Sequence, residues 1–375
     1  MRLDTYSAIA TLVGTTIGAG VLGIPYVIAE SGFFIGFLHI LLIGLAVILI
    51  NLYLGEITLR TKENHQISGY AHQYLGKKGK YVAIATMIGG VYGALIAYVI
   101  GVGNALGAIF GAESMWYSIG FWVISAAIVY VGLKAVKESE MLLTSIVILF
   151  AVFIIGAVLL SGKFNYEHLL TIQPAKAFVP FGVILFAFLG AAAIPEMKEE
   201  LVKRKSELKK AILIGGAMPI IIYALFAMAV VGVGSETSEV ATVQLGQLLG
   251  PAMNVIMNLF AVFAMGTSFL ALGLALKEMY LYDLGFSKMS AWIATVFVPL
   301  AVFLMGVSSF IAVIGIVGAI SGGMQGILIV LMHRNAKRYG KRKPEYTLHD
   351  YGIVGMVLIT IFVAGMTYAV FTSFS

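Results

Sequence analysis

The chain has 375 residues, of which 60% are hydrophobic and only 11% are charged. Soluble domains carry about 25% charged residues, so this composition predicts an all-α polytopic membrane protein. The absence of cysteine excludes disulfides, thiolate metal sites and a cysteine nucleophile. The net charge of +6 does not indicate nucleic-acid binding, because the basic residues lie between apolar segments.

Apolar segments long enough to cross a bilayer recur along the whole chain. A transmembrane helix needs about 20 apolar residues, and on this rule we expect eleven spans. Their approximate limits are 5–30, 33–60, 81–110, 116–134, 140–161, 176–196, 211–233, 251–277, 290–307, 310–332 and 351–373.

The positions of lysine and arginine predict how these spans are oriented. If the N-terminus is cytoplasmic, all of the 24 basic residues except Lys163 and Lys176 fall on the cytoplasmic side. Cytoplasmic loops of membrane proteins are enriched in these residues. We therefore expect a cytoplasmic N-terminus and an external C-terminus. The short loops and the lack of cysteine favour a prokaryotic plasma membrane.

The first span contains a segment, residues 14–25, that is a poor helix. Gly14, Gly18 and Gly20 fall within seven residues, and each costs about 1 kcal/mol relative to alanine in a helix. Unpaired backbone groups survive in a bilayer only beside protein or a polar cavity. The segment therefore predicts a discontinuous helix that binds a ligand through its backbone. A glycine-rich face for close helix packing would explain the same residues.

A second interruption is predicted in the sixth span, where residues 190–195 combine small side chains with a proline. By itself this segment is equally typical of a proline kink. It lies five spans after the first interruption, however, and an odd offset gives the two halves opposite orientations. Interrupted helices at corresponding positions of two inverted halves are typical of secondary transporters.

Four segments are similar to the amino acid–polyamine–organocation superfamily, and closest to its amino acid/auxin permease and hydroxy/aromatic amino acid permease branches. They are residues 14–26, 54–60, 190–197 and 266–274. The resemblance implies a leucine-transporter-like fold of five plus five inverted helices, with helices 1 and 6 broken and an eleventh helix appended. The repeats would be residues 1–161 and 162–332, followed by a basic cytoplasmic loop and the last helix in residues 333–375. Spans nine to eleven match only in number and length.

The resemblance also implies a substrate site between spans one and six, beside spans three and eight. Free amides at a helix start suit a carboxylate, which we expect at residues 18–20. Free carbonyls near Thr16 and at residues 187–190 suit an ammonium group. The predicted substrate-binding residues are Thr16, Ile17, Gly18, Ala19, Gly20, Tyr98, Phe186, Ala187, Phe188 and Gly190. Ordinary packing is an equally good explanation for Tyr98, and it is the more common role of aromatic residues at the spacing of Phe186 and Phe188.

The resemblance further implies a sodium site between the interruption of span one and span eight. Its ligands would be the carbonyls of Gly14, Ile17 and Ala264 and the hydroxyls of Thr267 and Ser268. Neutral oxygen ligands suit such a hard cation, although buried hydroxyls often bond to their own helix instead. Proton-coupled relatives place a lysine from span five here, and residues 141–161 contain none. A second sodium site in some relatives needs an asparagine where Val21 stands, so we expect only one.

The sequence thus predicts a secondary active transporter of neutral amino acids that works by alternating access with sodium as coupling ion. Proton coupling, or another small amine as substrate, remains the alternative. We expect no enzyme activity and no cofactor, because H-E-x-x-H, G-x-S-x-G and Walker A motifs are absent. The expected partners are an amino acid, a sodium ion and the lipid bilayer, and the oligomeric state is undefined. Glu30, Glu56 and Glu196 lie near span ends, where gating ion pairs, snorkelling and proton transfer all remain open.

Overall fold

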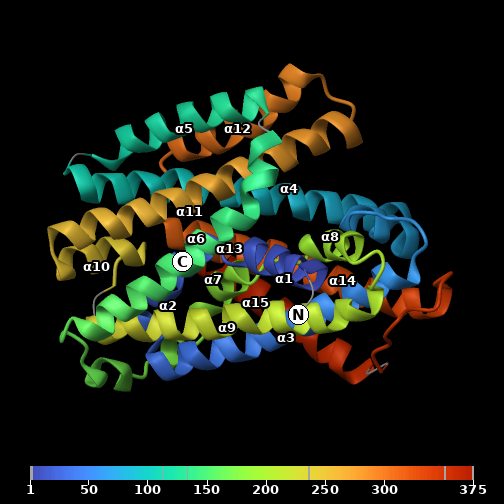
Figure 1. Ribbon diagram of the computed structural model, residues 1–375, viewed down its shortest axis with the longest axis horizontal. Helices are drawn as coiled ribbons and strands as arrows, with labels where there is room; N and C mark the ends of the chain where they lie inside the picture. Colours follow the sequence, from blue (N-terminus) through green and yellow to red (C-terminus); the bar gives the residue numbers. More distant parts are fainter. Residues whose placement is uncertain (1–2, 112, 133, 235–236, 350–351, 374–375) are drawn as a thin grey trace.

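The structure is a computed structural model that describes residues 3–111, 113–132, 134–234, 237–349 and 352–373. Within these ranges the chain is helical and contains no strand. Most of the long helices run side by side along the longest axis of the molecule (Figure 1). Seven helical segments there are long and apolar enough to cross a membrane. They are α3 (Phe33–Arg60), α4 (Ile67–Phe110), α5 (Ser114–Val131), α9 (Leu208–Val233), α11 (Pro251–Glu278), the run of α13 (Phe310–Val317), η5 (Gly318–Gly322) and α14 (Gly323–Tyr339), and α15 (Gly352–Ser373).

The other four expected spans coincide with two interrupted helix pairs, with a helix whose apolar part is Ile148–Leu160, and with one shorter helix. They are the pair α1 (Leu3–Thr16) and α2 (Gly20–Ser31), α6 (Lys134–Leu160), the pair α7 (Pro180–Ala187) and α8 (Ala193–Glu200), and α12 (Lys288–Leu304). Short helices fill several connections, namely η1 (Tyr166–Leu170), η2 (Pro174–Lys176), η3 (Lys205–Glu207), α10 (Ala241–Leu249) and η4 (Met279–Asp283). The all-helical class is therefore confirmed, and length and composition support seven spans, or eight if the bent pair α1–α2 is one span.

The first interruption is shorter than the sequence predicts. Only residues 17–19 lie outside helices, and the axes of α1 and α2 differ by 54° across them. Gly14 is still helical, because an apolar surrounding favours the helix wherever its hydrogen bonds can form. The Ile17 amide still donates to the Val13 carbonyl at 2.7 Å, whereas the Gly18 amide turns to the Thr16 carbonyl at 3.0 Å.

The second interruption spans residues 188–192, between α7 and α8. Prolines mark the start of both helices. Pro180 is the first residue of α7, and Pro195 lies in the first turn of α8. A proline in the first turn costs little, because its missing N–H would have no intrahelical partner there. Pro195 therefore begins a new helix instead of kinking a continuous one.

Two segments differ from the prediction outside the membrane spans. A short amphipathic surface helix is predicted within residues 60–80, and a helix does begin at Ile67, but it runs on into the third span across a kink at Gly76, where φ is 73°. Hydropathy cannot show this extension, because residues 67–80 are largely polar. The connection between the predicted spans 211–233 and 251–277 contains α10, a helix of nine residues.

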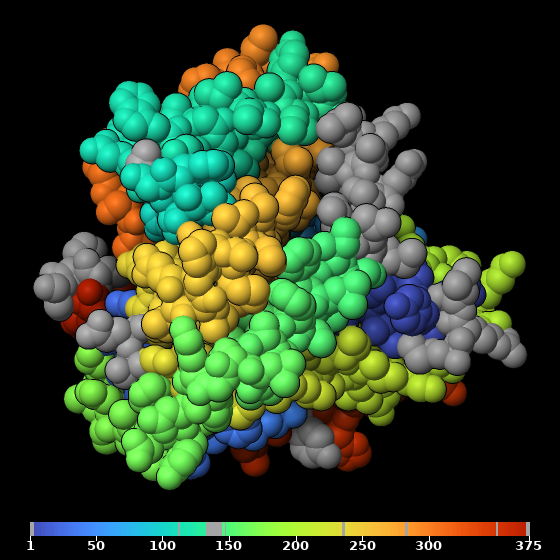
Figure 2. Space-filling view, turned by 60° about the vertical axis from the view of Figure 1, so that its left-hand side comes forward, coloured from blue at the N-terminus to red at the C-terminus, as the bar shows by residue number. Residues whose placement is uncertain are grey.

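The packing of the helices puts both interruptions at the centre. α4 packs along α5 and α11, while α3 packs along α9 and α14 (Figure 1). Between these two groups, α1 contacts α8 and α9, and α2 contacts α7. On one face α6, drawn in green, lies against α11, drawn in yellow and orange (Figure 2).

Candidate functional site

The two interruptions cross in direct contact. A Cβ added to Gly20 would lie 2.6 Å from the Cα and 2.8 Å from the Cβ of Ala187. A Cβ added to Gly190 would lie 2.4 Å from the Thr16 hydroxyl oxygen. Only glycine allows backbone to approach backbone this closely. The structure thus brings together four of the predicted substrate-binding residues, from the end of α1, the start of α2, the end of α7 and the segment before α8.

Free backbone groups accompany this crossing. Among the residues that the structure describes, the amides of Ala19 and Gly20 make no backbone hydrogen bond across the interruption, and neither do the carbonyls of Gly14 and Ile17. Amides at the start of α2 form a partial positive charge that suits an anion such as a carboxylate. The Gly18 amide, which the sequence also assigns to the substrate, already donates to Thr16.

The predicted residues of α4 and α11 adjoin the first interruption. The Ser268 hydroxyl oxygen would lie 3.3 Å from a Cβ on Gly18, and Ser268 also forms a hydrogen bond with Tyr98. The Thr267 hydroxyl lies 2.9 Å from the Phe263 carbonyl and 3.2 Å from that of Ala264. Thr267 therefore bonds to its own helix, as the alternative interpretation expects, while its oxygen keeps a lone pair for a cation.

The two predicted phenylalanines have different surroundings. Phe188 is 2% exposed, and its ring lies edge-on to Tyr223 with the ring centroids 5.0 Å apart. Phe186 packs tightly against the π-helical turn η5, since a Cβ on Gly318 would lie 2.7 Å from the Phe186 Cβ. Phe188 is therefore tied to the crossing, whereas Phe186 contacts the next helix outward.

Tyr223 of α9 is a central residue that the sequence analysis did not single out. It is fully buried, and its hydroxyl lies 2.8 Å from the carbonyl oxygens of both Thr16 and Ala187. These are the last residues of α1 and α7. A hydroxyl inside an apolar span must find a partner, so the sequence could have marked Tyr223 as polar, but not named its partners.

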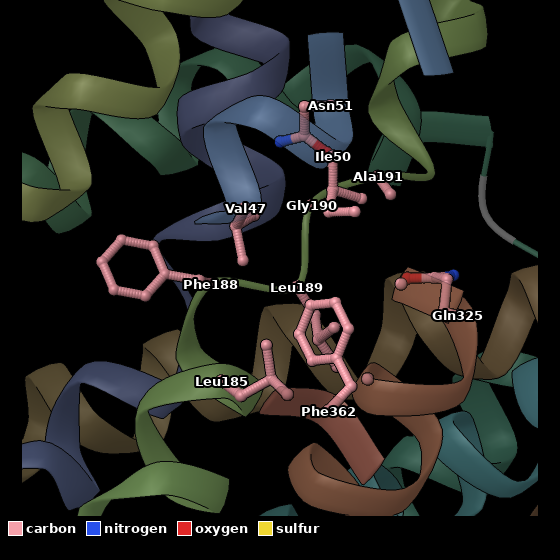
Figure 3. A pocket seen from close by; sticks show the side chains of 12 residues that line it. Val47, Ile50, Asn51, Leu185, Phe188, Leu189, Gly190, Ala191, Gln325 and Phe362 are labelled. Atoms are coloured by element: carbon pink, nitrogen blue, oxygen red, sulfur yellow. The ribbon is translucent and has the colours of Figure 1, made fainter. Parts of the chain in front are cut away.

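A small cavity lies beside the second interruption (Figure 3). It has a volume of about 20 Å³, enough for one water molecule and too small for an amino acid. Its polar side chains are Asn51 of α3 and Gln325 of α14. Asn51 is 2% exposed, and its side-chain carbonyl oxygen has no hydrogen-bond partner among the described residues. Tyr98 and Ala19 of the predicted substrate site are also buried.

Glu56, near the C-terminal end of α3, connects this helix to α14 and to the segment before α15. Its carboxylate accepts hydrogen bonds from His333 at 2.9 Å, from the Leu348 amide at 2.8 Å and from Arg60 at 2.8 Å. The side chain is fully buried. The cluster holds α14 and the segment before α15 against the end of α3, so Glu56 is a structural tie in this conformation.

At the opposite end of the bundle, two acidic residues contact neighbouring elements. Glu30 pairs with Lys176 of η2. Glu239 accepts hydrogen bonds from the Ser309 hydroxyl at 2.8 Å and the Ile311 amide at 3.3 Å, which caps the start of α13. Glu239 thus connects α13 to the segment before α10.

Comparisons with known proteins agree with this architecture. The sequence is similar to glutamine transporter 2 of Aliivibrio fischeri, with 24% identity over 370 residues that cover 95% of each chain. It is also similar to tyrosine-specific transport system 1 of Haemophilus influenzae, with 26% identity over 391 residues that cover 96% of this chain and 94% of the relative. Both relatives are named as amino acid transport proteins, and the similarity covers nearly the whole length of each.

Two solved structures show the fold. MhsT in complex with L-phenylalanine superposes with a TM-score of 0.69 at 16% identity, covering 99% of this chain and 98% of MhsT. The inward-facing conformation of Mhp1 gives a TM-score of 0.67 at 11% identity, covering 98% and 91%. The chain therefore has the leucine-transporter-like fold that both share.

The profile of the tryptophan/tyrosine permease family matches residues 2–371, which is nearly the whole chain. Its proteins are permeases, so the prediction that the chain is not an enzyme is confirmed. The predicted resemblance to the amino acid–polyamine–organocation superfamily is confirmed as well. The chain is a multi-pass membrane protein that belongs to the tryptophan/tyrosine permease family.

Proposed function

We propose that the protein is a secondary active transporter that carries neutral amino acids by alternating access and is coupled to sodium. The observation that carries this proposal is the crossing of two helix interruptions, at Gly20 and Ala187, in the middle of the bundle. The substrate class is supported by relatives named for glutamine, tyrosine and tryptophan, which are all neutral amino acids. Burial of the crossing supports a closed state between the two open ones.

The membrane arrangement is part of the proposal. We assign eleven spans, with α1–α2 and α7–α8 each forming one broken span, so that residues 1–161 and 162–332 form the inverted repeats. Residues 333–375 add the basic cytoplasmic loop and the last span. The N-terminus is cytoplasmic and the C-terminus external, in the plasma membrane. The charge asymmetry of the loops supports this orientation.

The substrate lies between the interruptions. Its carboxylate meets the amides of Ala19 and Gly20, which have the positive end of α2 behind them. Its ammonium meets the free carbonyls of Phe188 and Leu189, since the carbonyl of Ala187 already accepts the Tyr223 hydroxyl. Tyr98 and Phe188 form the aromatic walls for the side chain.

The coupling ion lies between α1 and α11, on the carbonyls of Gly14, Ile17 and Ala264 and the hydroxyls of Thr267 and Ser268. The approach of Ser268 to Gly18 supports this position. The unpaired carbonyls at the end of α1 support it as well. Coupling to protons is the alternative, and a different small amine is the alternative substrate.

Uptake into proteoliposomes tests the proposal. Radiolabelled glutamine, tyrosine and tryptophan are offered under an inward sodium gradient and, separately, under an inward proton gradient. We expect uptake of at least one of them, driven by sodium. The double variant Thr267→Ala, Ser268→Ala should lose about tenfold or more of its sodium-driven uptake, since two of the five ligands are removed.

A matched control comes from α15, where Thr360 and Thr367 bond to their own helix at 3.0 and 2.8 Å. Changing both to alanine removes equivalent hydroxyls far from the crossing and should leave uptake unchanged. Uptake that follows the proton gradient and ignores sodium would refute the sodium site. Uptake of none of the amino acids under either gradient would refute the substrate class.

A further inference from the structure

The Tyr223 hydroxyl is the only side-chain donor found, among the residues that the structure describes, that contacts both helix interruptions. Its oxygen lies 2.8 Å from the Thr16 carbonyl and 2.8 Å from the Ala187 carbonyl. Thr16 lies 207 positions and Ala187 lies 36 positions from Tyr223 along the chain. One atom therefore connects the ends of α1 and α7 through α9.

Both carbonyls lie at helix ends, where the Thr16 carbonyl also accepts the Gly18 amide at 3.0 Å. In a continuous helix, the Thr16 carbonyl would accept from residue 20 and the Ala187 carbonyl from residue 191. Neither of these bonds forms. Two carbonyl dipoles instead converge on one buried point, and this geometry creates a local negative potential. Without a donor or a cation at this point, the Ala187 carbonyl would be a costly unpaired buried acceptor, and the Thr16 carbonyl would keep only its bond from the Gly18 amide.

A phenol suits this position but is a limited donor. It has a single hydrogen, which the two carbonyls must share. The ring is fixed by burial and by edge-on packing against Phe188. The hydroxyl cannot follow if α1 and α7 move apart, so this contact is specific to the closed arrangement. No charged side chain among the described residues is recorded in contact with either carbonyl.

We propose that the hydrogen of the Tyr223 hydroxyl supplies the partial positive charge between the interruptions that a bound cation would otherwise supply. Tyr223 is then a positioning residue. Because its hydroxyl takes the place of a second cation, only the coupling cation between α1 and α11 binds. This inference rests on the proposed function for its transport consequences, but not for its effect on cation binding. It predicts that a chain without this hydroxyl recruits an additional small cation to the carbonyls of Thr16 and Ala187.

The experiment compares the full-length chain with Tyr223→Phe, which keeps the ring and removes only the hydroxyl. The control is Tyr92→Phe. Tyr92 also has a partly buried hydroxyl, bonded to Tyr280 at 2.6 Å and to the Ala294 carbonyl at 2.9 Å, away from the interruptions. Thermal unfolding in detergent is measured for all three in sodium chloride and in choline chloride of equal ionic strength. This readout does not require transport.

We expect sodium to raise the unfolding midpoint of Tyr223→Phe by more than that of the unaltered chain or of Tyr92→Phe. In proteoliposomes, amino acid uptake by Tyr223→Phe should fall about tenfold or more at low sodium. It should recover at high sodium, with a steeper dependence on sodium concentration than in the unaltered chain. Equal sodium-dependent shifts in all three proteins would overturn the inference.

Replacement of Tyr223 by 4-aminophenylalanine separates a lost donor from a disturbed fold. The amino group restores an N–H donor at nearly the same position, so sodium dependence should return to that of the unaltered chain. If Tyr223→Phe does not fold, the 4-aminophenylalanine variant is compared with the unaltered chain and Tyr92→Phe. A sodium-dependent shift equal to that of the unaltered chain supports the inference, and a shift above that of Tyr92→Phe overturns it. Absence of uptake by the unaltered chain refutes the proposed function alone, because the unfolding comparison still decides the role of Tyr223.

Discussion

Gly20→Ala tests whether the two helix interruptions cross as the structure shows. The new methyl group would lie 2.6 Å from the Ala187 Cα, 2.8 Å from its Cβ and 3.2 Å from its amide nitrogen. Two of these three atoms are backbone, so no change of side-chain rotamer relieves the overlap. α2 and α7 must separate, and the predicted substrate site lies at their contact.

The magnitude follows from two opposing effects. Overpacking a tightly packed interior costs about 1–3 kcal/mol, and a clash with backbone belongs at the upper end of that range. Alanine recovers about 1 kcal/mol of helix propensity relative to glycine, although Gly20 is the first residue of α2, where this gain is smaller. We therefore expect a net loss of about 1–2 kcal/mol of unfolding free energy and a larger loss of substrate affinity.

The assay is thermal unfolding in detergent, with and without amino acid. It compares three glycine-to-alanine variants in which the added methyl group overlaps its neighbours to different degrees. At Gly190 the added methyl meets the Thr16 hydroxyl at 2.4 Å, and this side chain can rotate away. At Gly89 the nearest atom is the Ser321 hydroxyl oxygen at 3.7 Å, which is ordinary contact. We expect Gly20→Ala to destabilise most, Gly190→Ala less, and Gly89→Ala to be neutral or slightly stabilising.

Two results would contradict this reasoning. If Gly20→Ala unfolds like Gly89→Ala, the start of α2 does not touch the end of α7. If Gly20→Ala lowers stability but leaves amino acid binding intact, the crossing is a packing contact and the substrate lies elsewhere. The second result would favour the interpretation of residues 14–25 as a glycine-rich packing face.

Two further predictions concern Glu56 and Lys198. Glu56→Gln replaces one acceptor oxygen by an NH₂ group that faces the donors of His333 and Arg60. It should lower the unfolding free energy by about 3–5 kcal/mol, as for other broken buried ion pairs. A change near zero in thermal unfolding would show that the cluster is solvated. Burial lowers the pKa of Lys198 from its ordinary 10.5 to about 8. The unfolded chain therefore binds more protons than the folded chain between these values, and the unfolding free energy should rise with pH from about 8 to 10.5. Lys198→Met should be more stable near pH 7 and lose this rise, and an unchanged pH profile would contradict the assignment.

The sequence by itself determined the helical elements, because they depend on local properties. Long apolar runs need helices to satisfy their backbone in a bilayer, and the seven helical segments that are long and apolar enough to cross it match predicted spans. Glycine and proline also placed both interruptions, since their conformational preferences act within a few residues. The extent of the first interruption was wrong, because Gly14 and Thr16 complete the last turn of α1 despite their low propensity.

Only the tertiary structure decided which polar groups meet. The sequence could show that Tyr223, Asn51 and Glu56 lie in apolar segments and need partners. It could not show that Glu56 binds His333, which lies 277 positions away, or that Tyr223 contacts both interruptions. These partners depend on the rotation of each helix about its axis and on the distance between helix axes. Both quantities are set by side-chain packing over the whole bundle. The helix interruptions, in contrast, are encoded by the residues at and next to them.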